Sequence, residues 1–147
     1  MCYFRAVTFP ASQGCLFSIL LFYSATTHAD QFVSWAGYEI HFATFSSLII
    51  PVDVAQTHGI VRAKNRIVTN ISIQQHEHSV KAMVVGTSTN LLGQVMTMDF
   101  AEVVEHSAVY YLANQVINER DTIRFHIQVQ PEGADMAYNL KFTRQYY

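Results

Sequence analysis

The sequence predicts an all-β protein whose fold is a single antiparallel β-sandwich, immunoglobulin-like, with about seven strands and one short helical turn. Apolar and polar residues alternate through most of residues 30–147, and turn-forming residues interrupt this alternation every ~8–12 residues. Such alternation is typical of antiparallel sheets with one buried face, whereas parallel strands read as continuous apolar runs. A small closed barrel is the alternative architecture.

Four segments alternate clearly enough to assign the face that points into the core. The residues expected to point inward are Tyr38, Ile40 and Phe42; Val61, Ala63, Ile67, Ile71 and Ile73; Ile123, Phe125, Ile127 and Val129; and Tyr138, Leu140 and Phe142. The β-prone runs VKAMVVGTS, QVMTMDFAEVV and AVYYLANQV are expected to supply the remaining strands.

Turn-forming strings separate these segments, namely HEHS, TNLLGQ, EHS, INERD and PEGAD. In PEGAD, Pro131 presets φ and Gly133 accepts a positive φ, which predicts a tight turn. The string PVDVAQTHG predicts a helix of at most two turns, opened by Pro51 and ended by Gly59. Asp53 falls in its first turn, where an acidic side chain is favourable.

Residues 1–29 read as a secretory signal peptide, with a compact apolar run at residues 15–23 and cleavage expected after Ala29. The run is shorter than the ~20 apolar residues of a transmembrane helix. Cleavage leaves one domain of 118 residues (147 − 29) with no transmembrane segment. Because Cys2 and Cys15 both precede the cut, we expect no disulfide and no cysteine nucleophile in the exported domain.

Charge and motif content argue against several function classes. The exported domain carries 11 acidic residues and 8 Lys plus Arg (9 − 1, since Arg5 is removed), a balance of −3 that does not predict nucleic-acid binding. The sequence contains no HExxH, phosphate-binding glycine loop, dinucleotide fingerprint or GxSxG. Glu102 and Glu105 fall on opposite strand faces and do not make a catalytic pair. We therefore expect a protein that is not an enzyme and uses no cofactor.

Several strings along the chain resemble an uncharacterised family of exported Gram-negative bacterial proteins, domain of unknown function 4426. They are GYEIHFATFSS, GIVRAKNR, GTSTNLLGQ, VYYLA, IRFHIQVQPEG and the closing YNLKFTRQYY. The resemblance covers nearly all of residues 30–147 and implies a small periplasmic domain behind a signal peptide. It implies no activity, ligand or site residue, and HEHS lies in none of the matching strings.

His76 and His78 in HEHS are the candidate metal ligands. On one strand they would point to the same face and could share a metal ion, but a site needs three or four ligands. A hairpin turn between two strands is the simpler interpretation. Met96 and Met98 could complete a copper(I) site with them, since thioethers are soft ligands, or could be adaptable core residues.

Arg62, Lys64 and Arg66 in VRAKNR alternate as if on one strand face. Three neighbouring cations repel one another unless acids or a ligand neutralise them. The strip is therefore either a solvated face, a face paired with Glu102 or Glu105, an anion site, or a docking surface for an acidic partner.

In GTSTNLLGQ, Asn90 and Gly93 suit a turn, and Gly86 suits a bulge or a close approach of another backbone. Leu91 and Leu92 between them could either plug the end of the sandwich or form an exposed apolar tip.

The leading hypothesis is an exported, non-enzymatic binding module for an unknown protein or envelope component. Its proposed contacts are Arg62, Lys64, Arg66, Leu91 and Leu92. The alternative is a periplasmic copper- or zinc-binding protein that uses His76 and His78.

Overall fold

A computed structural model of the chain describes residues 31–118 and 120–147. The predicted signal peptide, with both cysteines and the expected cut after Ala29, lies outside the described residues. The strands are β1 (Gln31–Trp35), β2 (Tyr38–Ser46), β3 (Arg66–Gln75), β4 (His78–Ser79), β5 (Ala82–Thr89), β6 (Val95–Met98), β7 (Phe100–Glu105), β8 (Ala108–Val116), β9 (Thr122–Pro131) and β10 (Tyr138–Gln145). A 3-10 turn, η1 (Ser47–Ile49), and a helix, α1 (Val52–Thr57), join β2 to β3.

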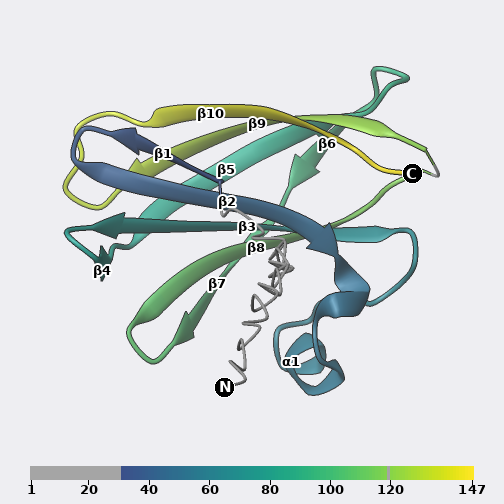
Figure 1. Cartoon of the computed structure of the whole chain (residues 1–147), viewed down its shortest axis with the longest axis horizontal. Helices are drawn as coiled ribbons and strands as arrows, with labels where there is room; N and C mark the ends of the chain where they lie inside the picture. Colours follow the sequence, from purple (N-terminus) through teal and green to yellow (C-terminus); the bar gives the residue numbers. More distant parts are fainter. Residues whose placement is uncertain (1–30, 119) are drawn as a thin grey trace, which may run out of the picture.

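These strands form two antiparallel sheets packed face to face (Figure 1). The first sheet has the order β1-β2-β3-β8-β7, with β4 also paired to β3, and the second has the order β10-β9-β5-β6. The predicted antiparallel sandwich is therefore confirmed, and the sheets do not close into a barrel. The described residues hold ten strands rather than about seven. One reason is that the run QVMTMDFAEVV divides at Asp99, with β6 in the second sheet and β7 in the first.

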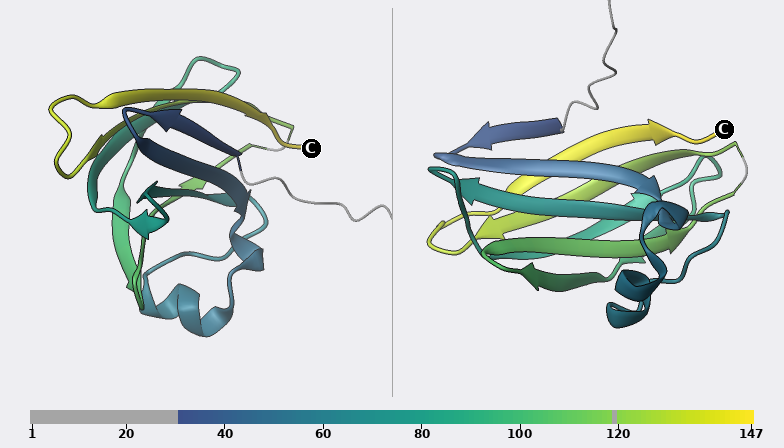
Figure 2. Two further views of the ribbon diagram at one scale, coloured as in Figure 1. Left: turned by 60° about the vertical axis from the view of Figure 1, so that its left-hand side comes forward. Right: turned by 60° about the horizontal axis from the view of Figure 1, so that its bottom comes forward.

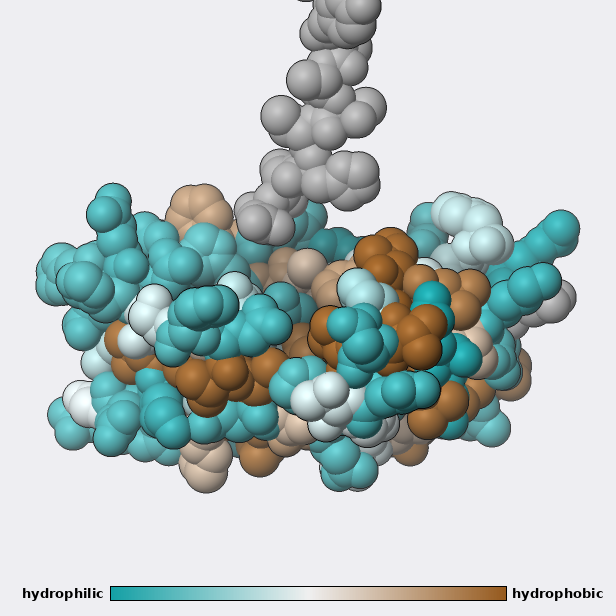
Figure 3. Space-filling view, turned by 90° about the horizontal axis from the view of Figure 1, so that it is seen from below, coloured by the Kyte–Doolittle hydropathy of each residue, from teal (hydrophilic) through white to brown (hydrophobic). Residues whose placement is uncertain are grey.

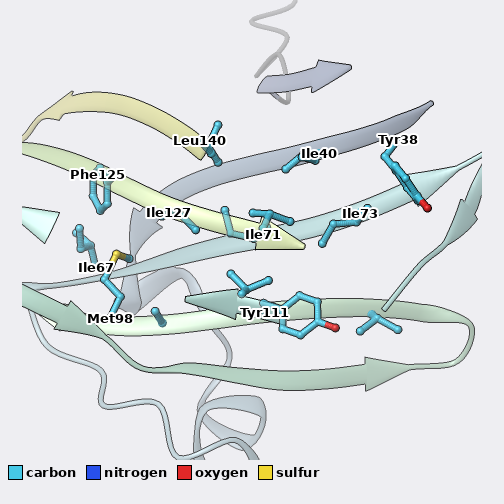
Figure 4. Close-up of a cluster of buried hydrophobic side chains, with 14 of the residues drawn as sticks. Tyr38, Ile40, Ile67, Ile71, Ile73, Met98, Tyr111, Phe125, Ile127 and Leu140 are labelled. Carbon is cyan, nitrogen blue, oxygen red and sulfur yellow. The ribbon is translucent and has the colours of Figure 1, made fainter. Parts of the chain in front are cut away.

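The core lies between the sheets and is built from the residues that alternation places inward. Ile40, Ile71 and Ile73 point into it from the first sheet, and Ile127 and Leu140 from the second (Figure 4). All five are at most 2% exposed. Each side chain of this size stabilises the fold by roughly 1.5–3 kcal/mol when buried. The inward assignments for β2, β3, β9 and β10 are confirmed. The expectation for Val61 is wrong, because this residue precedes β3 and its side chain is 52% exposed.

A second, smaller apolar cluster lies on the outside of the first sheet. Val68 points outward from β3 and is fully buried beneath Ile50 and Ala55 of the η1–α1 segment. Figure 2 shows α1 on this outer side of the sandwich. The predicted helix at residues 51–59 is confirmed, with Pro51 before it and Gly59 at a φ of +64° after it.

Seen from below, the side that carries α1 shows apolar areas interrupted by hydrophilic side chains (Figure 3). The exposed apolar residues of the η1–α1 segment and its continuation are Leu48, Ile49, Val52 and Val61. Among the described residues, no helix has the length and apolar character needed to cross a membrane.

Tight hairpins gather at one end of the sandwich, on the left in Figure 1. His76 and Glu77 are the two central residues of one of them, because Gln75 of β3 pairs with His78 of β4. Their φ values of +49° and +65° match a two-residue turn of type I′. At Pro131 the PEG turn is also present, closed by the amide of Ala134 donating to the Pro131 carbonyl at 3.0 Å.

Candidate binding surface at the loop end

The end of the sandwich opposite the hairpins is formed by the segment before β3, the β5–β6 and β8–β9 connections and the C-terminal residues (Figure 1). We call it the loop end. Here the amide of Ile117 donates to the Asn65 carbonyl at 2.9 Å, and the amide of Tyr146 donates to the Asp121 carbonyl at 2.8 Å. These bonds hold together three segments that are far apart in the sequence, namely the segment before β3, the β8–β9 connection and the C-terminal residues.

The β5–β6 loop presents two leucines to solvent at this end. Asn90 closes the loop, since its Oδ1 accepts from the Gln94 amide at 2.9 Å and its carbonyl accepts from the Gly93 amide at 3.0 Å. Leu91 and Leu92 at the tip are 64% and 78% exposed. The interpretation of these leucines as a plug is therefore wrong, and the exposed-tip interpretation is confirmed. The loop closes on Asn90 and turns its tip away from the core.

A buried carboxylate anchors this loop to the neighbouring one. Asp121 is 5% exposed, and its Oδ1 accepts from the backbone amide of Leu91 at 3.2 Å. Its Oδ2 accepts from Asn118 Nδ2 at 3.1 Å. Hydrogen bonds to a carboxylate are among the stronger ones in proteins, roughly 1.5–3 kcal/mol. The exposed tip is thus carried on a fixed backbone.

Two cations lie at the same end of the sandwich as the anchored loop. Lys64 and Arg120 line an open hollow of about 280 Å³ together with Tyr146 and Tyr147. Both cations are exposed, and among the described residues neither has a hydrogen-bond or ion-pair partner. Arg120 has a φ of +53°, a left-handed conformation that costs free energy in a residue other than glycine. Burial raises the pKa of the Tyr146 hydroxyl, so this ring stays neutral at the edge of the hollow.

The predicted basic strip is only partly realised. Strand β3 begins at Arg66, so Arg62, Lys64 and Arg66 do not share a strand face. The segment before β3 is held by Ser47 instead, whose Oγ donates to the Ala63 carbonyl at 3.1 Å and accepts from the Ala63 amide at 3.0 Å. Hydrogen bonds to the buried Ser47 side chain take the place of the backbone hydrogen bonds that a neighbouring strand would make. The alternation of apolar and polar residues does not reveal this.

Two of the three cations are already occupied by bonds within the molecule. Arg62 Nη2 donates to the Leu48 carbonyl at 2.9 Å, and Arg66 Nη1 donates to Asn114 Oδ1 at 2.6 Å. The suggested pairing with Glu102 is wrong, because that carboxylate binds Lys81. Of the strip, only Lys64 reaches the loop end with a free charge among the described residues.

The candidate metal ligands are not on one strand. His76 lies in the turn and His78 begins β4, and both side chains are exposed. Met98 is buried in the core and Met96 lies on the same face of β6, so both fill the interior. Strands β4 and β6 lie toward opposite ends of the long axis (Figure 1), and the histidine and methionine pairs do not meet.

Among residues 31–118 and 120–147, no group of three or more His, Cys, Asp or Glu side chains is arranged to hold a metal ion. Metal binding by His76 and His78 stays a prediction.

A second polar cluster bridges the two sheets near the hairpin end. Lys81 Nζ lies 2.8 Å from Glu102 Oε1, and the Tyr111 hydroxyl donates to Glu102 Oε2 at 3.2 Å. The hydrogen bond from Lys81 lowers the pKa of Glu102 and raises the pKa of Lys81. Burial raises the pKa of Tyr111, whose oxygen accepts from the Ala82 amide at 2.8 Å. Its charges are paired with each other, so we interpret this cluster as structural.

Sequence reasoning missed Arg120, Tyr146 and Tyr147. The string INERD predicts a turn and no contact, and no pattern in the sequence assigns a role to the terminal tyrosines. No local pattern relates them to Leu91, since the connection runs through the Asp121 carboxylate and carbonyl. The one sequence signal for Arg120 was its place in a turn, directly before the acidic Asp121.

The family model for Domain of unknown function (DUF4426) matches residues 33–147. The chain belongs to the DUF4426 family. A crystal structure of a DUF4426 family protein from Pseudomonas aeruginosa PAO1 is 30% identical, with a TM-score of 0.74, and the match covers 80% of this chain and 94% of that one. The resemblance inferred from the sequence strings is confirmed. The comparison with curated proteins found no match.

Two structures of FetP from uropathogenic Escherichia coli share the fold of this DUF4426 chain. A copper-bound variant is 14% identical, with a TM-score of 0.57, and the match covers 80% of this chain and 95% of that one. FetP "as isolated" is also 14% identical, with a TM-score of 0.56 and coverage of 80% and 93%. At this identity the likeness shows the sandwich fold alone.

Proposed function

We propose that this DUF4426 protein is an exported, non-enzymatic binding module that captures a protein partner at its loop end. The observation that carries this proposal is the pair Leu91 and Leu92, whose side chains are exposed on a backbone anchored to the buried Asp121. A prearranged loop loses little conformational entropy on binding, so its apolar tip can contribute fully to affinity. Loops held by a rigid sandwich often carry function.

The chemistry of the surface specifies the kind of partner. Lys64 and Arg120, at the same end of the sandwich as the leucines, favour a partner that offers carboxylates as well as an apolar pocket. Arg62 and Arg66, which donate to oxygen acceptors within the molecule, stabilise the protein's own structure in this proposal. The contact set is therefore Lys64, Arg120, Leu91 and Leu92.

Site-specific photocrosslinking in cells tests the surface. A photoreactive residue at Leu92 should crosslink one discrete protein, whereas the same residue at Val104, an exposed valine near the hairpin end, should not. Lys64→Glu with Arg120→Glu should lower the Leu92 crosslink about tenfold, as expected for opposing charges at an interface. Equal crosslinking from both positions, or no effect of the charge reversal, contradicts the proposal.

Export is tested separately. Mass spectrometry of the protein from a periplasmic fraction should find Asp30 as its first residue, because cleavage is expected after Ala29. Recovery of a chain that still begins at Met1 in the cytosolic fraction contradicts export without bearing on the loop end.

A further inference from the structure

The outer face of the second sheet carries unpaired positive charge. Arg124 and His126 point outward from β9, because they alternate with the buried Ile123, Phe125 and Ile127. Lys141 on β10 is paired directly with His126. Three donors therefore lie on adjacent positions of two neighbouring strands.

Their spacing suits a single small ligand. Residues directly opposite on paired strands have Cβ atoms about 4.5–5.5 Å apart, and residues two apart on one strand are separated by about 7 Å. The long side chains of Arg124 and Lys141 and the ring of His126 can therefore converge over one point. Hydroxyl groups border the same place, since Thr87 pairs with His126 and Thr143 pairs with Arg124.

No acid on these strands neutralises this cluster. The outward positions of β10, β9, β5 and β6 are Asn139, Lys141, Thr143, Gln145, Thr122, Arg124, His126, Gln128, Gln130, Met83, Val85, Thr87, Thr89, Val95 and Thr97. None of them is a carboxylate. Asp99 follows β6, at the edge of the sheet opposite β10.

The two cations and the histidine of this face differ from the cations that are bound within the molecule. Among the described residues, Arg124, His126 and Lys141 make no hydrogen bond or ion pair, whereas Lys81 is paired with Glu102 and Arg66 with Asn114. Arg124 and Lys141 occupy diagonal positions on the strand pair, since Lys141 is paired with His126, and like charges on long side chains at such positions repel each other unless a counter-charge is present. An unneutralised cluster on a regular strand pair therefore indicates an external anion.

The surface is hollowed at this point. One depression of about 290 Å³ is lined by Arg124, His126, Lys141, Thr143 and neighbours, and a second of about 280 Å³ by Val85, Thr87, His126 and Gln128. His126 belongs to both. The first depression has the cationic groups and the second is partly apolar.

We propose that this face binds a tetrahedral oxyanion of the phosphate class, either inorganic phosphate or the phosphoryl group of a monoester. The Arg124 guanidinium donates to two oxygens at once, and Lys141, His126 and the threonine hydroxyls serve the others. A carboxylate has only two oxygens and leaves part of this donor set unused. The second depression, beside Val85, accommodates the organic part of a monoester. The proposal concerns a different surface from the loop end and does not rest on it.

Nuclear magnetic resonance titration of the purified protein at constant ionic strength tests this inference. The probes are inorganic phosphate, glycerol phosphate as a simple monoester, and acetate as a carboxylate. Both phosphate probes should produce saturable shifts confined to Thr87, Arg124, His126, Lys141 and Thr143, and acetate should bind at least tenfold more weakly. A monoester that binds more tightly than inorganic phosphate identifies an organic phosphate as the ligand, and equal affinities identify the free anion.

Arg124→Gln with Lys141→Gln should weaken phosphate binding at least tenfold. Both side chains are exposed, so the variant should keep the wild-type chemical shifts away from the site. Arg62→Gln with Lys81→Gln removes the same charge away from both proposed surfaces and should change the affinity less than twofold. Equal weakening by the two double variants, or acetate binding as tightly as phosphate, overturns the proposal, because general charge attraction then explains the binding.

Discussion

The outer faces of the two sheets differ although both are built from alternating strands. The face of the first sheet is covered over β3 and β8 by the η1–α1 segment, with Val68 fully buried beneath it. The face of the second sheet has no covering element among the described residues and carries Arg124, His126 and Lys141 toward solvent.

The difference originates in a few outward positions. Strand β3 has consecutive apolar residues at Ile67 and Val68, so both of its faces need burial, whereas β9 has polar residues at every outward position from Arg124 to Gln130. Arg66 at the start of β3 on the first sheet donates a hydrogen bond to Asn114 within the molecule. A covered face contributes to stability, and an uncovered face is available for binding.

The largest expected effect comes from making the same substitution, valine to alanine, on the outer face of each sheet. Val68→Ala should lower the free energy of unfolding by about 2–3 kcal/mol, because it leaves a cavity under α1. Val85→Ala on the uncovered face should change it by less than about 0.5 kcal/mol. Urea denaturation of both variants measures this, and similar losses at the two positions would break the comparison.

Next in size is a test of how closely β5 and β9 approach on the uncovered sheet. A Cβ at Gly86 would lie 3.0 Å from the His126 carbonyl oxygen and 3.0 Å from the Ile127 side chain. Gly86→Ala should therefore cost about 1–3 kcal/mol, since the neighbouring strand must shift. The outward Thr87→Ala is the control and should be within about 0.5 kcal/mol of wild type by thermal unfolding. A neutral Gly86→Ala would show that this sheet is less tightly packed than its geometry indicates.

A smaller effect is expected where the sheets are joined. Tyr111→Phe removes the hydroxyl that accepts from the Ala82 amide and donates to Glu102, and should cost about 1–2 kcal/mol. Tyr110→Phe, on the outward side of the same strand, should cost less than about 0.5 kcal/mol in the same denaturation assay. If the two variants were equally stable, the bridge would not contribute to the coupling of the sheets.

The smallest effect concerns the Lys81–Glu102 pair and its pH dependence. The pKa of Glu102 is lowered below its ordinary value of 4.5, so the pair stabilises the fold above that value and the contribution is lost as the pH falls through the lowered pKa. The pKa of Lys81 is raised above 10.5, so the contribution is present below 10.5 and lost as the pH rises through the raised pKa. The free energy of unfolding of Glu102→Gln should differ from that of the wild type only between these two pH limits.

Unfolding curves recorded from acid to alkaline pH would reveal this window. Glu105→Gln, three residues further along and exposed, is the control. Its free energy of unfolding should differ from that of the wild type by an amount that does not change with pH. A flat difference for Glu102→Gln as well would mean that solvent screens the pair completely.

Much of the fold could be predicted from local patterns. Alternation at Ile123, Phe125 and Ile127 placed these residues in the core, and Pro51 and Gly59 delimited the helix. The failures have a common cause. Arg62 alternates like a strand residue, but the buried Ser47 takes the backbone bonds that a neighbouring strand would have made.

The candidate sites were harder to predict than the fold. Leu91 was recognised as a possible contact because loops on a rigid sandwich often carry function, yet the alternatives of a plug and an exposed tip could not be separated by pattern. The role of Asp121 was not visible, since it depends on a contact between two loops that are 30 residues apart.

By itself, the sequence determined the sandwich, the inward faces and the family, because alternation and turn residues act over a few positions and need no knowledge of distant contacts. Only the tertiary structure decided which charges are neutralised and which stay free. Strand pairing set Lys141 beside His126, and loop packing brought Lys64 and Arg120 to one end with the exposed leucines. Charge neutralisation depends on distances between residues remote in the chain, and these distances exist only once the strands have paired.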